Sequence, residues 1–455
     1  MNMKTLILLF FSLISSIFLV KNISSAPSYT AFEKKHPLLW KTEIGRASFR
    51  TNVISTPTSL IMGSNGNQFI DWGVVDKRSG LYMINPSNGK IRSALNFQKW
   101  GDFDVNGVIK VNNKILFGND NEELFCVDFS GNILWRKMVS GDIEAEPVLL
   151  DINRKKVIVY ATELGEVSAV NPETGATIWS YFTPDFSGWR KSNNRNIFKI
   201  KAFMSNTKSF FTRPALADVN NDGVQDLVYS SYNDVVYCIS GSNGKLLWTL
   251  DDDATDFSLL VDARNIRGTI EFWITSYIYN SANGNYSLNI SRISNQGKEV
   301  GKIFLQHDDE FSLSLNSFQI GKQQYLYATC DSLFEVENNR VVRTLHIGES
   351  YVRKDSWNNS EDLSVRNYPD QLFGTKIFKY DNQESCIALL SQFDRANYTQ
   401  GFVTIISLKD WKVLGRYAIP ASSELPPQIS DLNHDGKDEI LINCSDGFTY
   451  CYQIK

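Results

Sequence analysis

The sequence has few histidines and no excess of basic charge. Of its 455 residues only four are histidine, and the formal net charge is −4, from 46 basic and 50 acidic side chains. Zinc sites and histidine-based acid–base catalysis therefore have little material to draw on. A chain without a polycationic surface also lacks the electrostatic basis for binding nucleic acid. We expect no nucleic-acid partner.

Cysteines are few, and no two of them are adjacent. The six are Cys126, Cys238, Cys330, Cys386, Cys444 and Cys451. An even number in an exported chain would suit disulfides. However, Cys126, Cys238 and Cys451 occupy the same position of a repeated strand, and equivalent positions of different repeats lie too far apart to bond. We predict that most of these thiols are free, buried and packed as small hydrophobic groups.

Long apolar runs are missing except at the N-terminus. There, Lys4 precedes the apolar stretch from Leu6 to Val20, and the small residues up to Ala26 follow. This pattern predicts a secretory signal peptide over residues 1–26. An uncleaved N-terminal anchor is the alternative, because Pro27 directly follows the cleavage position. No later segment is long and apolar enough to cross a bilayer, so we expect an exported periplasmic or extracellular chain without a membrane span.

Aromatic residues are abundant, and a hairpin pattern repeats along the chain. Aromatics make up 13% of the residues, which favours strands. The segment from Gly165 to Trp179 returns from Asp234 to Trp248, and looser copies run from Glu123 to Trp135 and from Gly80 to Ile91. Each copy reads as a strand, a tight turn with Asn or Gly, and a second strand, which predicts a β-hairpin.

A further pair of strands precedes each hairpin, so the repeating unit has four antiparallel strands in about forty residues, the size of a propeller blade. Eight units are predicted, beginning near Gly45, Asp102, Asp142, Phe211, Asp251, Asp308, Asp362 and Ala421. The last unit has room for only three strands, and Leu38 to Thr42 resembles the outer strands of other units. We therefore predict an all-β fold, an eight-bladed β-propeller of four-stranded antiparallel blades. In it, the N-terminal strand completes the C-terminal blade, and residues 27–455 form a single domain.

Two insertions interrupt the repeat, near residues 183–210 and 348–374. The first is rich in basic and aromatic residues, and the second carries aromatics among mixed charges. Long loops in compact domains are disproportionately functional. We expect these rim loops to meet a protein or glycan partner, with an anionic peptide or a membrane-facing partner also compatible. A solvated loop without a partner is the alternative.

Two acidic loops share one spacing of oxygen-bearing side chains. Residues 218–226 and 431–439 both carry such side chains at positions 1, 3, 5 and 9 and glycine at position 6. Ca²⁺ takes six to eight oxygens, and alternate positions of a turning loop point inward. Turns rich in Asx residues that hold no metal are the alternative. A third copy, from Asp151 to Lys156, has bases in place of acids and is expected to hold no ion.

The hairpin from Ala169 to Trp179, with Asn171, Thr174 and Gly175, resembles the repeat signature of pyrroloquinoline-quinone-type propellers. The resemblance implies an eight-bladed propeller in which the tryptophan packs between neighbouring blades. The acidic loops resemble the calcium-binding FG-GAP repeats of integrin-like propellers. That resemblance implies structural calcium held by the side chains of Asp218, Asn220, Asp222 and Asp226 and of Asp431, Asn433, Asp435 and Glu439, with the carbonyls of Val224 and Lys437.

Quinone-dependent dehydrogenases share the repeat type, and they supply the alternative function. Many of them stack the quinone on a pair of adjacent cysteines, which this sequence lacks, and it has no Cys-x-x-Cys-His haem motif. No nucleophile elbow or P-loop is present either. We therefore expect a monomeric, non-catalytic binding scaffold that is stabilised by calcium and holds no quinone. The alternative is a quinone-dependent oxidoreductase with a propeller-bound quinone and calcium.

Overall fold

The computed structural model describes residues 30–48, 50–66, 78–97, 103–184, 210, 212–231, 234–251, 255–266, 268–280, 285–308, 316–321, 324–328, 332–347, 351–354, 365–368, 371–380, 383–395, 398–421, 423 and 425–454. The predicted signal peptide lies outside these residues. So does most of the predicted insertion at 183–210, of which only 183, 184 and 210 are described.

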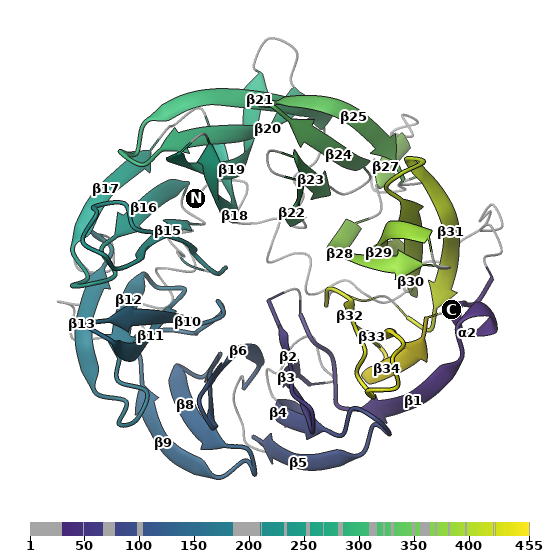
Figure 1. Ribbon diagram of the computed structural model, residues 1–455, viewed down its shortest axis with the longest axis horizontal. Coiled ribbons are helices and arrows are strands. Elements are labelled where there is room, and N and C mark those ends of the chain that lie inside the picture. The colour runs from purple at the N-terminus through teal and green to yellow at the C-terminus, as the bar shows by residue number, and fades with distance from the viewer. Residues whose placement is uncertain are drawn as a thin grey trace.

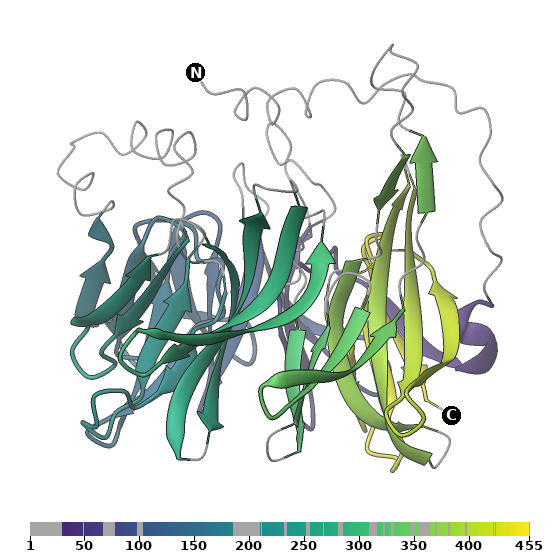
Figure 2. The same cartoon turned by 90° about the horizontal axis from the view of Figure 1, so that it is seen from above.

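Apart from one two-stranded ribbon, the described strands form four-stranded antiparallel sheets placed around a common axis (Figure 1), and the strands of these sheets run along that axis (Figure 2). In chain order the first three sheets are β2 (Val53–Ser55), β3 (Leu60–Asn65), β4 (Ser79–Ile84) and β5 (Ile91–Asn96); β6 (Val105–Val111), β7 (Lys114–Asn119), β8 (Glu123–Asp128) and β9 (Ile133–Met138); and β10 (Val148–Ile152), β11 (Lys155–Ala161), β12 (Glu166–Val170) and β13 (Thr177–Phe182).

The next three are β14 (Ala215–Ala217), β15 (Asp226–Ser230), β16 (Val235–Ile239) and β17 (Leu246–Asp251); β18 (Thr255–Ile266), β19 (Thr269–Asn280), β20 (Asn285–Ser294) and β21 (Glu299–Asp308); and β22 (Asn316–Gly321), β23 (Gln324–Ala328), β24 (Ser332–Glu337) and β25 (Arg340–His346). They are followed by β28 (Gln371–Tyr380), β29 (Gln383–Arg395), β30 (Tyr398–Ser407) and β31 (Lys412–Ile419). In each sheet the first strand lies nearest the axis and the last strand lies on the outside (Figure 1).

The ring is closed by strands from opposite ends of the chain. The closing sheet contains β32 (Gln428–Ser430), β33 (Glu439–Asn443), β34 (Phe448–Gln453) and, on its outer edge, β1 (Leu38–Glu43). Trp40 is opposite Cys451 and Thr42 is opposite Thr449. The predicted pairing of the N-terminal strand with the C-terminal strands is confirmed. It covers a β-sheet edge that would otherwise be open.

The second predicted insertion contains a small sheet of its own. β26 (Tyr351–Lys354) and β27 (Val365–Tyr368) pair with each other as a two-stranded antiparallel ribbon. β28 begins at Gln371, inside the range assigned to the insertion. At the end of the first insertion, Phe210 is fully buried and packs against Tyr229, with their ring centroids 4.7 Å apart. The returning chain is thereby fixed to the core.

The hydrophobic core lies between neighbouring sheets. One cluster joins Leu81 and Met83 of the first sheet to Phe117 and Phe125 of the second. Equivalent clusters occupy further junctions around the ring. The described cysteine side chains, Cys126, Cys238, Cys444 and Cys451, are buried and unbonded, as predicted. Cys330 lies outside the described residues.

Tryptophans of the outer strands fasten each sheet to the next. The indole N–H of Trp135 donates to the carbonyl of Pro172 at 3.1 Å, and the indole lies so close to Gly175 that a Cβ there would come within 2.8 Å of it. The same arrangement links Trp40 to Pro86 and Gly89, Trp179 to Gly241 and Gly244, and Trp248 to Asn295 and Gly297. The packing between neighbouring blades that was predicted for the hairpin tryptophans Trp135, Trp179 and Trp248 is confirmed, and Trp40 adds a fourth case.

A short helix, α2 (Phe32–Lys35), lies on the outside of the ring where it closes (Figure 1). Phe32 packs edge-on against Tyr452 of β34 and Tyr417 of β31, and the buried His36 ring lies 5.7 Å from that of Tyr417. The N-terminal segment therefore joins the last two sheets. Among the described residues, none of the helices has the length and apolarity needed to span a membrane.

Candidate functional site

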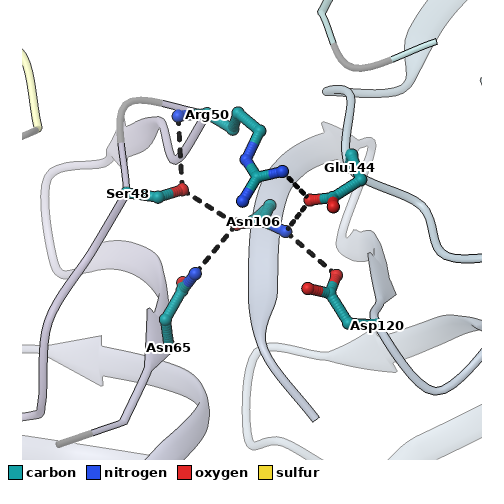
Figure 3. A network of polar contacts seen from close by, with 6 residues as sticks. All are labelled: Ser48, Arg50, Asn65, Asn106, Asp120 and Glu144. Carbon is teal, nitrogen blue, oxygen red and sulfur yellow. Dashed lines mark hydrogen bonds and ion pairs between the residues drawn. The ribbon is translucent and has the colours of Figure 1, made fainter. Parts of the chain in front are cut away.

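A buried polar network lies near the axis and joins the first three sheets (Figure 3). Its centre is Asn106 on β6, whose side-chain amide donates to Asp120 at 3.1 Å and to Glu144 at 2.9 Å. The amide oxygen of Asn106 accepts from the Ser48 hydroxyl at 2.9 Å and from the Asn65 amide at 3.2 Å. Because Ser48 and Glu144 come from the connections that enter the first and third sheets, the network holds three sheets in register.

The charged side chains of this network are largely, but not completely, shielded from water. Arg50 forms an ion pair with Glu144, and their side chains are 19% and 8% exposed. Burial by itself lowers the pKa of Arg50, but the carboxylates of Glu144, Asp120 and Asp104 outweigh it and raise the pKa. Burial, together with the neighbouring carboxylates of Glu144 and Asp104, raises the pKa of Asp120 well above its usual range. The network therefore contains one carboxyl group that resists ionisation.

The geometry of the network suits a structural link. The Ser48 hydroxyl donates to an amide oxygen, which is not a base that would activate it as a nucleophile. No pattern in the sequence predicts this network. Its members come from separate connections and strand ends, and no short motif contains more than two of them.

The predicted calcium loops join the two inner strands of their sheets, β14 to β15 and β32 to β33, and their last residues, Asp226 and Glu439, are the first residues of β15 and β33. Both loops place a residue with positive φ at position 4, Asn221 and His434, and a glycine with positive φ at position 6. The Asp218 carboxylate accepts from the N–H of Asp222 at 3.1 Å and of Gly223 at 3.0 Å. Asp431 makes the equivalent bonds at 3.0 Å. The two loops therefore share one conformation.

In each loop two carboxylate oxygens lie around the amide nitrogen of the asparagine at position 3. The Asn220 amide nitrogen lies 3.2 Å from Asp222 Oδ2 and 3.5 Å from Asp226 Oδ1. In the second loop the Asn433 amide nitrogen lies 3.2 Å from Asp435 Oδ2 and 3.1 Å from Glu439 Oε1. Glutamate at position 9 thus reaches the place that aspartate takes in the first loop.

The electrostatics differ between the exposed and the buried carboxylates of the loops. Hydrogen bonding from the Ser242 hydroxyl lowers the pKa of the exposed Asp222. Burial raises the pKa of Asp226 and of Glu439, although each accepts backbone N–H bonds. A cation placed between these carboxylates would favour their charged forms.

The donor set of the loops fits calcium only when it includes neutral oxygens. Within the described parts of the chain, no three carboxylate, imidazole or thiol groups form a metal-holding cluster by themselves. A calcium ion would therefore need the Asn220 and Asn433 side chains and the carbonyls of Val224 and Lys437 as well. In the third loop, residues 153 and 154 form a two-residue turn with positive φ, and Lys156 pairs with Asp151 at 2.7 Å.

Comparison with known proteins identifies the repeat. Residues 77–196 match the profile of a family described as outer membrane protein assembly factor BamB. A curated relative, the outer membrane protein assembly factor BamB of Shewanella oneidensis, is 29% identical over 76 residues, which make up 16% of this chain and 18% of that protein. The predicted resemblance to quinoprotein-type repeats is confirmed, and the chain is a β-propeller.

Solved structures show the same fold over most of the chain. BamB from Moraxella catarrhalis superposes with a TM-score of 0.50 at 11% identity, covering 92% of this chain and 100% of that one. The Dos1 propeller and Saccharomyces cerevisiae Sqt1 each give a TM-score of 0.58, at 10% and 9% identity, and each covers 92% of this chain and 96% and 99% of the other. At such identities the likeness concerns the fold alone.

Proposed function

We propose that this chain is an exported, non-catalytic propeller of eight blades that binds a protein partner as an assembly scaffold. The observation that carries the proposal is the match of residues 77–196 to an outer membrane assembly factor. The apolar N-terminal stretch supports export, in this proposal to the periplasm. Each four-stranded sheet of the ring would be one blade.

The outer face of the ring supports a binding role. The large hydrophobic side chains that are exposed within the described residues all lie on outermost strands, namely Leu38, Leu39, Ile91, Ile133, Leu134, Met138, Ile178, Leu246, Val300, Phe304, Val342, Val413 and Leu414. The same strands carry nine basic and only four acidic side chains, although the whole chain is net acidic. Exposed apolar surface rimmed by charge is typical of interaction sites.

In this proposal, calcium in the two acidic loops is structural. It would neutralise clustered carboxylates and tie the connection between two inner strands. The FG-GAP-like spacing supports it, as does the gathering of the carboxylate oxygens of Asp222 and Asp226, and of Asp435 and Glu439, around the side-chain amide of Asn220 or Asn433. Ions at these positions would stabilise the scaffold without taking part in a reaction.

The scaffold role is tested by placing a photo-activated cross-linker on the outer strands of the protein in its native host, with variants that carry or lack residues 185–209. We expect a discrete protein adduct from one sector of the ring. The competing function, a quinone-dependent oxidoreductase, is tested on purified protein with added quinone and Ca²⁺. A bound chromophore with dye reduction, and no adduct from any outer strand, would replace the scaffold by the enzyme.

A further inference from the structure

One junction of the ring has the glycine of the tryptophan-docking arrangement but not the tryptophan. Trp135 is opposite Cys126 in its hairpin, and Trp179 is opposite Ala169. In the hairpin of β4 and β5, the equivalent position on β5 is Ser93, which is opposite Met83 of β4. Ser93 faces Gly131 in the turn of the next sheet. A Cβ on Gly131 would meet only Ser93 among the described residues, at 3.9 Å, whereas the other four docking glycines have an indole within 2.8 Å.

The remaining junctions are filled in other ways or lack the glycine. At the junction of β25 and β31, Arg343 occupies the docking position and lies 4.4 Å from the ring centroid of Trp411. On β21 the position is Gly301, and the facing turn carries Asn338 and Asn339. Among the junctions that the structure describes, the one between β5 and β9 alone combines a docking glycine with a small side chain opposite it.

The walls of this slot are apolar and basic. Trp135 contacts the third sheet, so the alternate residues of β9, Leu134, Arg136 and Met138, face β5, its neighbour on the outside of the ring (Figure 1). The exposed fractions of Leu134 and Met138 are 47% and 55%, and that of the Arg136 side chain is 60%. Arg92 of β5 adds a second exposed cation. We define the docking slot as Ile91, Ser93, Gly131, Leu134, Arg136 and Met138.

The turn beneath the slot has the hydrogen bonds of a filled one. The N–H of Gly131 donates to Asp128 at 3.0 Å, as that of Gly297 donates to Ser294 at 3.0 Å. In the filled turn, the carbonyl two residues before the glycine, that of Asn295, accepts the indole N–H of Trp248. The equivalent carbonyl in the slot is that of Phe129.

We propose that this slot receives an aromatic side chain, best an indole, from an acidic segment of a partner protein. The neighbouring junctions show what a glycine of this kind accommodates, which is a flat ring with an N–H donor. Arg92, and Arg136, which is 60% exposed although it pairs with Glu123 at 3.7 Å, provide the charge complementarity for carboxylates that flank the ring. A buried aromatic anchor with a charged rim is the usual form of a binding hot spot.

The inference rests on the proposed scaffold function only for its biological role, and short peptides test the slot itself. The probe is the capped peptide Glu-Trp-Glu, titrated against the purified full-length protein by NMR, with Glu-Ala-Glu and Lys-Trp-Lys as comparisons. We expect Glu-Trp-Glu to bind with a dissociation constant on the order of 1–10 mM, as suits one aromatic anchor. Glu-Ala-Glu should not bind, and Lys-Trp-Lys should bind at least about fivefold more weakly.

Filling the slot from within gives the decisive variant. Ser93→Trp should place an indole on Gly131, raise the melting temperature by about 1–3 °C and abolish Glu-Trp-Glu binding. The matched control Thr249→Trp adds an indole at an exposed position of β17, and it should leave binding unchanged. Arg136→Glu also removes the ion pair with Glu123 at 3.7 Å, so its melting temperature is measured first; the folded variant should reverse the preference toward Lys-Trp-Lys.

Two results would overturn the slot. One is equal binding of Glu-Trp-Glu to the wild type and to Ser93→Trp, and the other is no binding of Glu-Trp-Glu to the wild type. Neither result touches the scaffold proposal, which the cross-linking experiment tests at every sector of the ring. If cross-linking fails while Glu-Trp-Glu still binds, the proposal of the docking slot stands and the proposal of a scaffold function is wrong.

Discussion

Each docking tryptophan depends on the glycine beneath it. Gly244 has a φ of +73°, and a Cβ there would come within 2.5 Å of the Trp179 ring. Replacing Gly244 by another residue would therefore lower the free energy of unfolding in two ways. One is the left-handed backbone, which disfavours other residues, and the other is the loss of close contact with the indole.

The two costs can be separated by comparing two glycines. Gly268 has a φ of +89°, and a Cβ added there would have no described atom within 4 Å. Gly268→Ala should lower the free energy of unfolding by about 1 kcal/mol through the backbone alone, and Gly244→Ala by roughly 2–4 kcal/mol because the indole must also move. Urea denaturation measures both. Equal losses would mean that the indole does not depend on the glycine.

Asp120 predicts an unusual dependence of stability on pH. Burial and nearby carboxylates raise its pKa in the folded chain, so its contribution to stability is present at low pH and is lost as the pH rises through that pKa. Asp120→Asn should therefore stabilise the protein at pH 7.5, and the gain should shrink as the pH falls toward about 3.9, the ordinary aspartate value.

The control for Asp120 is Asp128, whose pKa is lowered by hydrogen bonds from Asn132. Its stabilising contribution is present above the ordinary aspartate pKa, so Asp128→Asn should lower stability at pH 7.5. Thermal melts between pH 4.5 and 7.5 give both signs. A destabilised Asp120→Asn at pH 7.5 would show that the ionised carboxylate strengthens the network.

At the scale of single elements, the acidic loops predict a dependence on calcium. If each loop binds one ion, free calcium at a hundredfold excess over the dissociation constant should add about 2.7 kcal/mol per site. A chelator should accordingly lower the melting temperature of the wild type. The double variant Asp222→Asn/Asp435→Asn should lose this response, and Asp151→Asn, in the basic third loop, should keep it. An unchanged wild-type melt with no metal by mass spectrometry would retire the calcium proposal.

The sequence predicts the strands well where the pattern that defines a hairpin lies within one short segment. The hairpins ending at Trp135, Trp179 and Trp248 combine alternating apolar residues with a glycine turn, and each forms as predicted. The polar network escaped prediction because Ser48, Asn106 and Glu144 become neighbours only when three sheets assemble. The contact of Arg343 with Trp411 was not predicted either. At that junction an arginine lies where the other outer strands have tryptophan, and Trp411, with a positive φ, lies where the other turns have glycine.

At the scale of the whole molecule, the stability of the closed ring depends on the closing strand, β1. Trp40 is buried, and its indole N–H donates to Pro86 at 2.8 Å, so it fixes β1 to the first sheet. Trp40→Ala should cost about 3–5 kcal/mol, as expected for a large buried aromatic. It should also free the edge of β34 for pairing between molecules.

The comparison for Trp40→Ala is Trp248→Ala, which removes the same contact inside the ring. Both variants should lose similar stability in urea denaturation, but only Trp40→Ala should show concentration-dependent association in analytical ultracentrifugation. Association of both variants, or of neither, would mean that β1 is not held by its tryptophan. The closure itself was predictable because Leu38 to Thr42 repeats the outer-strand pattern and the last unit lacks one strand.

The pairing of β1 with β34 also governs the order in which this protein can be completed. Leu38 leaves the ribosome long before Tyr452, the residue it finally pairs with. Contacts this distant along the chain form late and slow folding. Until β1 pairs with β34, both strands have an unpaired edge. The protein is most prone to aggregation, and has the greatest need of a chaperone, between the synthesis of β34 and the closure of the ring.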